Sequence, residues 1–565
     1  MLARQQGSGT QNRRIAWLAG YLLYLSLLLC LLALVYGAVK LYVLAKMEVV
    51  VSLTADDAGY FFKIAQNVVA GKGFTFDGIN KTNGFQPLWL YALLPLAWLM
   101  RGASPEVFFR VALMYQVVLV VIAGIFFYYA IVSFTNRVIS TITTVIFYLI
   151  STVWFLNGME SGVLLLCVSG LLAYSLRHQV FFDYQPKKAF ILGLLLGLVL
   201  LARLDMIFLV IAMYLFISIW ILWRFADRQW RQQQLKQVGL SLAGLGLVTV
   251  PYFLYNQLAF GALMPISGQL KNSFPHIVEV SFGPPRIPRQ VTMLLLMTMV
   301  ICLTNLFLLR SSFFENLKHK YFIFLFIVFS FSILMHYLNT ALFMKWAVFR
   351  WHFSIYSFVF CLGLVDVLIR LRFIVGRPII LWLTPLFTIA VSGLMLTRFD
   401  RMAKHTNWHA IAYKAAVWTR RHTPQDAILA MKDAGTFGFF SQRAVINLDG
   451  LVNNLEYQTA LKERRLNEYL HAKGVQYLVQ HAFISNDVNL RTVVYTSQNP
   501  LQVSTDVELV IAGNYERLQL QYRSQLYRTM SDPITVYRKD ELYRSEPYPV
   551  EVSPYRTVLV IWKLQ

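Results

Sequence analysis

Long uncharged runs of apolar residues recur through the first two thirds of the chain, and they restrict its fold more than any other feature. The first run extends from Ala16 to Ala38, which exceeds the roughly 20 residues that a helix needs to cross the hydrocarbon core of a bilayer. Of the 565 residues, 57% are apolar and only 14% are charged, which excludes an ordinary soluble domain. The sequence therefore predicts a polytopic α-helical membrane protein.

The apolar runs predict about 11 transmembrane helices. We expect them at about 15–38, 107–134, 138–155, 161–177, 189–201, 206–223, 237–259, 291–309, 321–341, 349–369 and 378–397. A further apolar stretch from Pro87 to Met100 is too short for a span and contains a proline, so we expect a short helix at the membrane surface. With this count and a cytoplasmic N-terminus, every strongly basic short loop faces the cytoplasm, as the positive-inside rule requires.

This topology divides the chain into two parts. Residues 1–399 form the membrane domain, and its first outer loop, about 46–106, lies on the outer side together with residues 400–565. Helix and strand patterns alternate in 400–565, which predicts a small extracytoplasmic α/β domain, and Asp433 and Asp449 end two of its apolar runs, where an acidic residue is typical of a turn. Most of the net charge of +23 precedes Asp400, where it marks topology, so we expect no nucleic-acid partner.

The first outer loop has the most informative sequence, TADDAGYFFKIAQNVVAGKGFTFDGINKTNGFQPLW. From Ala58 onward its apolar residues recur at helical spacing until a glycine-containing turn, which predicts a short amphipathic helix. Asp56 and Asp57 stand at the start of this helix, just outside the first span, and two adjacent carboxylates there suit a general base. A capping box between Thr54 and Asp57 would explain Asp57 without catalysis.

These motifs resemble the GT-C superfamily of membrane glycosyltransferases. The resemblance lies in the acidic pair after the first span, the G-x-G-F-x-F turn and the T-N-G-F-x-P-L-W segment. It continues through N-G-M-E-S (157–161), L-A-R-L-D (201–205), M-P-I-S-G-Q-L-K (264–271), D-A-G-T-F-G-F-F (433–440) and L-D-G-L-V-N (448–453). Within the superfamily, the chain looks most like bacterial polyprenyl-phosphate-sugar-dependent mannosyl- and arabinofuranosyltransferases.

The resemblance implies a GT-C-like fold and an enzyme of the bacterial cytoplasmic (inner) membrane. Its activity would be inverting transfer of a sugar from a polyprenyl-phosphate-linked donor to a cell-envelope glycan, lipid or protein acceptor on the outer face. Asp56 would be the catalytic base, with Asp57 beside it; other branches carry Asp-Glu, which leaves the role of Asp57 open. A divalent cation at Asp56 and Asp57 occurs in some branches, but no metal-ligand spacing in this sequence requires one. The chain has no D-x-D motif, which agrees with a donor that carries no nucleotide.

Four further residues are candidates for contacts with the donor or acceptor. Glu160 opens the fourth predicted span, Arg203 lies between two short apolar runs, Lys271 lies in a polar outer loop, and Lys63 follows Asp56 on the same helical face. Each also has a structural explanation. Glu160 would satisfy a helix dipole, Arg203 would pair with Asp205, Lys271 would be a surface lysine, and Lys63 would snorkel to the interface.

Two other functions remain open at this stage. A transporter or flippase of lipid-linked glycans would also have many spans, but we find no paired halves with matching broken helices and few ionisable residues within the spans. A ligase or polymerase of lipid-linked glycans has a similar size and works on the same face, but we expect it to rely on outer arginine and histidine residues rather than on Asp56.

Overall fold

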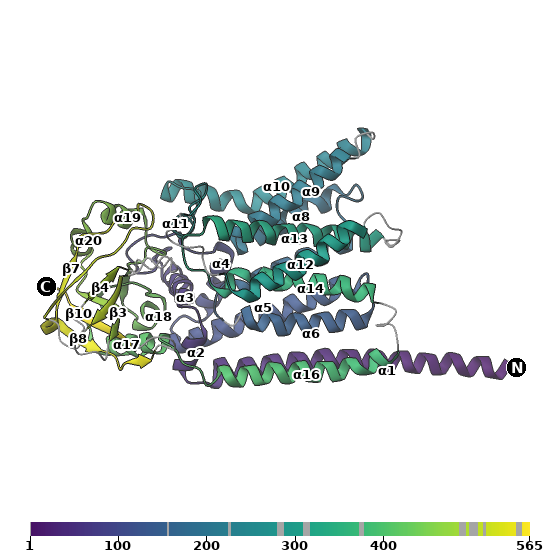
Figure 1. The fold of residues 1–565 in the computed structure, drawn as a ribbon, viewed down its shortest axis with the longest axis horizontal. Coiled ribbons are helices and arrows are strands. Elements are labelled where there is room, and N and C mark those ends of the chain that lie inside the picture. The colour runs from purple at the N-terminus through teal and green to yellow at the C-terminus, as the bar shows by residue number, and fades with distance from the viewer. Residues whose placement is uncertain are drawn as a thin grey trace.

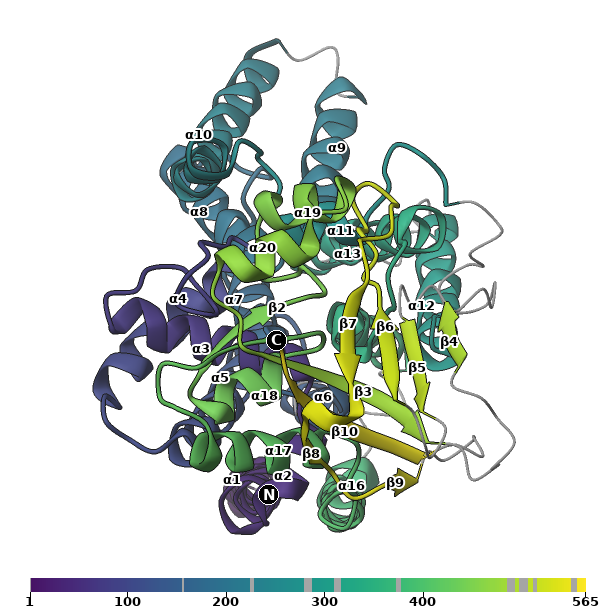
Figure 2. The same ribbon diagram turned by 90° about the vertical axis from the view of Figure 1, so that its left-hand side faces the viewer.

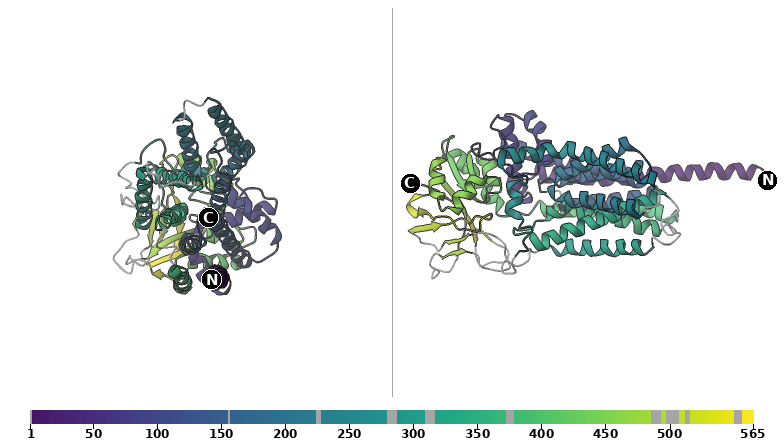
Figure 3. Two further views of the ribbon diagram at one scale, coloured as in Figure 1. Left: turned by 90° about the vertical axis from the view of Figure 1, so that its right-hand side faces the viewer. Right: turned by 90° about the horizontal axis from the view of Figure 1, so that it is seen from above.

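The computed structural model describes residues 2–154, 157–223, 228–278, 287–308, 317–371, 378–484, 493–496, 507–511, 516–549 and 556–565. Figure 1 shows a bundle of long helices that run alongside one another, with an α/β unit at one end. We call that end of the bundle the domain face. The first helix extends past the other end, so the N-terminus lies far from the α/β unit (Figure 3).

The long helices account for the predicted spans. They are α1 (Leu2–Val39), α5 (Pro105–Val132), α6 (Arg137–Trp154), α7 (Ser161–His178), α8 (Pro186–Ala202), α9 (Ile207–Trp223), α10 (Arg228–Phe260), α12 (Arg289–Leu308), α13 (Leu317–Phe343), α14 (Ser354–Arg370) and α16 (Pro378–Met402). Within the described ranges, nine helical segments are long and apolar enough to cross a membrane. Helices α6 and α8, with 18 and 17 residues, are the two bundle helices outside these nine. The protein is therefore a multi-pass membrane protein.

Short helices and turns lie at the domain face. They are the π-helical turn η1 (Lys40–Leu44), α2 (Met47–Leu53), α3 (Asp56–Val69), α4 (Pro87–Leu99), η2 (Leu204–Met206), α11 (Ile266–Lys271) and η4 (Arg350–Phe353). The expected amphipathic helix is α3, and it ends before Gly71 and Gly73, which both have the positive φ that glycine allows. The expected short helix is α4, which lies beside α3 at the end of the bundle and not along it (Figure 1).

The C-terminal unit is built around a mixed sheet. Its elements are α17 (His409–His422), β1 (Ile428–Met431), α18 (Gly435–Ser441), β2 (Ala444–Asn447), α19 (Leu455–Lys462), α20 (Leu466–Ala472), β3 (Tyr477–Ile484), β4 (Val493–Thr496), β5 (Val507–Ile511), β6 (Arg517–Leu520), β7 (Ile534–Tyr537), η5 (Arg538–Asp540), β8 (Glu541–Arg544), β9 (Tyr548–Pro549) and β10 (Arg556–Lys563). Strands β2, β1 and β3 are parallel, and β10 joins β3 antiparallel. The predicted α/β fold of this segment is confirmed.

The two faces of this sheet are buried in different cores. Alternate residues of a strand point to opposite faces, and β1 shows this: Leu429 packs with α17 and α18, whereas Ala430 packs with α19 and α20. The core that contains Leu429 continues into the membrane part, whereas the other core is internal to the unit. Figure 2 shows the unit from its outer side, with α19 and α20 away from α17. Helices α17 and α18 therefore lie between the sheet and the bundle.

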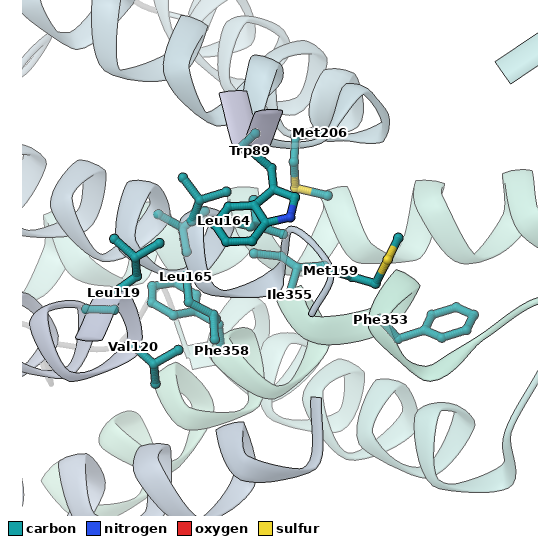
Figure 4. Packing of buried hydrophobic residues seen from close by; sticks show 14 of the residues in the cluster. Trp89, Leu119, Val120, Met159, Leu164, Leu165, Met206, Phe353, Ile355 and Phe358 are labelled. Carbon is teal, nitrogen blue, oxygen red and sulfur yellow. The ribbon is translucent and has the colours of Figure 1, made fainter. Parts of the chain in front are cut away.

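An apolar layer beneath the domain face supports the loops above it. Figure 4 shows Trp89 of α4 among Leu164, Met206 and other buried side chains of neighbouring helices. The Trp89 indole Nε1 donates to the carbonyl of Gly158 at 3.2 Å, and Gln116 of α5 accepts from the Gly158 amide at 3.2 Å. Gly158, in the loop before α7, is thus hydrogen-bonded to both α4 and α5.

Candidate functional site

Five segments of the membrane part meet at the domain face, and hydrogen bonds of backbone and side-chain groups hold several of them together. They are the start of α3, the loop before α7, the turn between α8 and η2, helix α11, and η4. The Ala55 amide donates to the Asn157 carbonyl at 2.9 Å, which places the loop before α7 against α3. The Leu204 amide donates to Gln86 at 3.1 Å, which connects the α8–η2 turn to the T-N-G-F-Q-P segment. Residues from distant parts of the sequence are thereby brought to one place.

Asp56 lies where the membrane part meets the C-terminal unit. Its two carboxylate oxygens accept the backbone N–H groups of Gly435 at 2.7 Å and Thr436 at 2.8 Å, both at the start of α18. Burial raises the pKa of Asp56 well above that of an ordinary carboxyl; the two amides oppose the rise, and the charges of Asp433 and Asp57 add to it. Because each oxygen has two lone pairs, the carboxylate keeps acceptor capacity for a substrate proton.

Asp57 faces a cation and does not cap its helix. Helix α3 begins after Ala55, no side chain caps it, and the Thr54 hydroxyl donates to the Val51 carbonyl at 2.9 Å. The capping-box interpretation of Asp57 is therefore wrong, because Thr54 is turned toward α2. The Lys271 Nζ lies 3.7 Å from the Asp57 carboxylate, and both side chains are about one-fifth exposed. Burial raises the pKa of Asp57, and Lys271 opposes that rise.

Glu160, Arg203 and Asp205 form a buried ionic group next to this pair. Arg203 donates through Nη1 to Glu160 Oε1 at 2.9 Å and to the Trp351 carbonyl at 2.8 Å. It also donates through Nε to Asp205 at 3.0 Å, with a further contact from Nη2 to Asp205. Four of its five N–H donors are thus used within the protein. The ion pair between Arg203 and Asp205, which was the structural explanation for Arg203, is present. Arg203 has one N–H donor left for a substrate.

The second oxygen of Glu160 differs from the rest of this group. Glu160 is 2% exposed, and its Oε2 has no hydrogen-bond partner among the residues that the structure describes. Glu160 does not cap α7 through its side chain. Burial raises the pKa of Glu160, while the charges of Arg203 and Lys271 lower it.

Two histidines, His336 and His352, lie near this group, and His336 belongs to it. His336 of α13 contacts Asp205 through Nε2 at 3.1 Å and the Tyr356 hydroxyl through Nδ1 at 3.0 Å. His352 follows Trp351 in η4 and is 9% exposed. No local sequence pattern identifies the contacts of His336, because Asp205 and Tyr356 belong to other elements.

Lys63 lies in a different environment. Its side chain is buried, so it does not snorkel as the alternative interpretation expected, and burial lowers its pKa to about 8. The charges that act on it are those of Lys72 and Arg443 rather than those of Asp57 or Glu160. A contact of Lys63 with donor or acceptor therefore stays a prediction.

The residues around Asp56 and Asp57 fit a divalent cation poorly. Asp56 already accepts two amides, and Asp57 faces the Lys271 ammonium. Among the described residues, no group of three or more His, Cys, Asp or Glu side chains is placed to hold a metal ion.

Comparisons with known proteins agree with the fold. Residues 401–537 match the family model for a domain of unknown function (DUF8728). A search of curated proteins found no match. An oligosaccharyltransferase of Archaeoglobus fulgidus, solved with a tethered acceptor peptide containing the NVT sequon, superposes with a TM-score of 0.50 and 14% identity, over 83% of this chain and 70% of that one.

Two more solved structures are similar over much of the chain. The Archaeoglobus fulgidus enzyme in complex with an inhibitory peptide and a dolichol-phosphate has a TM-score of 0.49 and 14% identity over 83% of this chain and 70% of its own. ArnT from Cupriavidus metallidurans, bound to undecaprenyl phosphate, has a TM-score of 0.49 and 10% identity, over 85% of this chain and 96% of its own. At this identity, the oligosaccharyltransferase superposition establishes a shared GT-C-like fold of a polytopic helical part with a C-terminal domain.

Proposed function

We propose that the protein is a glycosyltransferase that moves a sugar from a polyprenyl-phosphate-linked donor to a cell-envelope glycan, lipid or protein. The reaction takes place on the outer face of a bacterial cytoplasmic membrane. Residues 1–399 supply the catalytic part, and residues 400–565 are extracytoplasmic. The motif resemblance to the mannosyl- and arabinofuranosyltransferases supports this proposal, and the shared GT-C-like fold is compatible with it.

The single observation that carries the proposal is the environment of Asp56. A carboxylate oriented by two amides, with a raised pKa and free lone pairs, suits a general base close to neutral pH. It lies at the domain face of the bundle, where a lipid-linked substrate in the membrane and an acceptor outside it would meet. A transporter would have little use for a carboxylate pair on an outer loop.

The chemistry follows from the positions of the charged groups. Asp56 removes the proton from an acceptor hydroxyl, whose oxygen attacks the anomeric carbon of the donor as the bond from that carbon to the phosphate oxygen breaks. The bond electrons leave with the polyprenyl phosphate, and configuration at the anomeric carbon inverts. Lys271 stabilises the charge that develops on the leaving phosphate. Asp57 holds Lys271, and Glu160 holds Arg203 beside it.

The pH dependence of transfer tests the base assignment. Asp56 must be ionised to accept a proton, so the rate falls as the pH drops through its pKa. Because that pKa is raised, the acid limb of kcat/KM is expected well above the value of about 3.9 that is typical of an exposed aspartate. The measurement is transfer from one donor over a pH series on the acid side. An acid limb near that ordinary value would contradict the assignment.

Replacing Lys271 with glutamine tests the role of the cation. We expect kcat to fall by about 10²-fold, because one charged donor to the developing phosphate charge is lost. Lys46→Gln is the matched control, since Lys46 is an exposed lysine of the first outer loop. Single-turnover transfer separates the chemical step from product release, and equal rates for Lys271→Gln and Lys46→Gln would contradict the role.

A further inference from the structure

Two turns of the C-terminal domain lie directly on α3. Tyr60, one helical turn after Asp56, is 3% exposed, and its hydroxyl donates to Asp449 Oδ2 at 2.8 Å. The same hydroxyl accepts the Asn447 side-chain amide at 3.0 Å and the Ala434 backbone amide at 3.1 Å. One buried phenol therefore joins α3 to the turn after β1 and to the turn after β2.

Asp449 ties the same two turns to each other. Its Oδ2 also accepts from the Asn447 side chain at 2.9 Å and from the Asp433 amide at 3.3 Å, and its Oδ1 accepts from the Leu451 amide at 2.8 Å. The carboxylate is 7% exposed. An aspartate that the sequence explains as a turn residue thus joins both turns to the helix that carries Asp56.

The backbones of the two parts are in close contact. A Cβ on Gly435 would lie 1.9 Å from the Asp56 carbonyl oxygen, and a Cβ on Gly59 would lie 2.1 Å from the Gly435 carbonyl oxygen. In the T-N-G-F-Q-P segment, a Cβ on Gly84 would lie 1.7 Å from the Leu451 carbonyl oxygen. No side chain fits at these positions, so the backbones of the two parts touch there. A displacement of the domain would therefore also displace the amides that contact Asp56.

We propose that the C-terminal domain completes the catalytic site, with Tyr60, Asn447 and Asp449 as positioning residues that hold the Gly435 and Thr436 amides on the Asp56 carboxylate. This assigns a catalytic role to the region that matches the domain of unknown function, in addition to any role in acceptor binding. The inference rests on the proposed function, because it takes Asp56 as the base.

The direction of a pH shift distinguishes positioning from a simple charge effect. The charged groups facing Asp56 are Asp57 on its own helix and Asp433 in the turn after β1, which are paired with Lys271 and Lys432 at 3.7 Å. The two amides favour the ionised form of Asp56, so losing them raises its pKa. Removing the Asp449 charge without moving the amides would instead leave the carboxyl pKa values unchanged or lower them, since that charge raises the pKa of Asp57.

The test uses Tyr60→Phe and Asp449→Asn in the full-length protein. Both are expected to lower kcat by about 10- to 100-fold, with little change in KM for the donor, because a displacement of order 1 Å costs about that much. Both are also expected to move the acid limb of the pH profile to higher pH. Tyr522→Phe is the matched control, because it removes a buried tyrosine hydroxyl that donates to Gln480 within the domain, away from Asp56.

The outcomes separate this inference from the proposed function. Slower transfer with the acid limb at higher pH in both variants, and neither change in Tyr522→Phe, would support the positioning role. Wild-type rates in both variants, or an acid limb that moves to lower pH in Asp449→Asn, would overturn it. If Asp56→Asn itself transfers at the wild-type rate, the proposed function fails. Unfolding midpoints for all variants show whether a loss of activity reflects a loss of fold.

Discussion

Sugar transfer by Asp56→Asn is expected to be about 10²- to 10⁴-fold slower than by the wild type, because a placed general base contributes that much to a proton transfer. Asparagine has nearly the same size but cannot accept the acceptor proton. The Gly435 and Thr436 amides point at the two carboxylate oxygens, so the asparagine amide group must face one of these donors. A lower unfolding midpoint is therefore expected as well, and single-turnover assays need a folded variant confirmed by gel filtration.

Asp57→Asn is the matched control for this prediction. It removes the neighbouring charge on the same turn of α3 but leaves the Asp56 amide contacts in place. We expect partial transfer, since the cation Lys271 loses its partner but remains near the site. If Asp57→Asn were the inactive variant and Asp56→Asn the active one, the roles of the two carboxylates would be reversed.

Arg203→Leu is expected to cause the largest loss of stability among the changes considered. It leaves the buried Glu160 carboxylate without its cation, and breaking a buried ion pair from one side typically costs about 3–5 kcal/mol. The side chains of Arg203 and Glu160 are 5% and 3% exposed, so solvent cannot replace the lost contacts. The measurement is the thermal unfolding midpoint in detergent, with and without a bound polyprenyl phosphate.

Lys40→Leu is the control for this change. It breaks the Lys40–Asp400 ion pair, whose side chains are 38% and 54% exposed, and such exposed pairs contribute little to stability because water screens them. An Arg203→Leu protein that unfolds at the same temperature as Lys40→Leu would contradict the structural role of the buried group. It would also restore Arg203 as a candidate for direct contact with the substrate.

The fold could be predicted where the physical signal is local. Apolar length identified the helices of the bundle, helical spacing with two glycines identified α3, and the proline-containing stretch of 14 residues identified α4 as too short to span. The α/β character of the C-terminal domain followed from alternating patterns of the same kind. These features depend on neighbours a few residues apart, which a sequence displays directly.

The contacts of the site could not be predicted in this way. Asp56 and its amide partner Thr436 are 380 positions apart, and Tyr60 and Asp449 are 389 positions apart. The local pattern also offered Thr54 as a helix cap, whereas its hydroxyl donates to the Val51 carbonyl in the preceding helix. For Arg203, the sequence left function and ion pairing open, and the choice depends on Glu160 and Trp351, which other elements supply.

Single-turnover transfer by the wild type in nanodiscs, with a panel of polyprenyl-phosphate sugars and extracted envelope acceptors, tests the central claim most directly. We expect one donor class to be consumed, with one polyprenyl phosphate released for each sugar that appears on the acceptor. The same donor should remain intact with Asp56→Asn. If no donor in the panel is consumed, while the protein in vesicles moves a lipid-linked glycan across the bilayer, the protein is a transporter and the account is wrong.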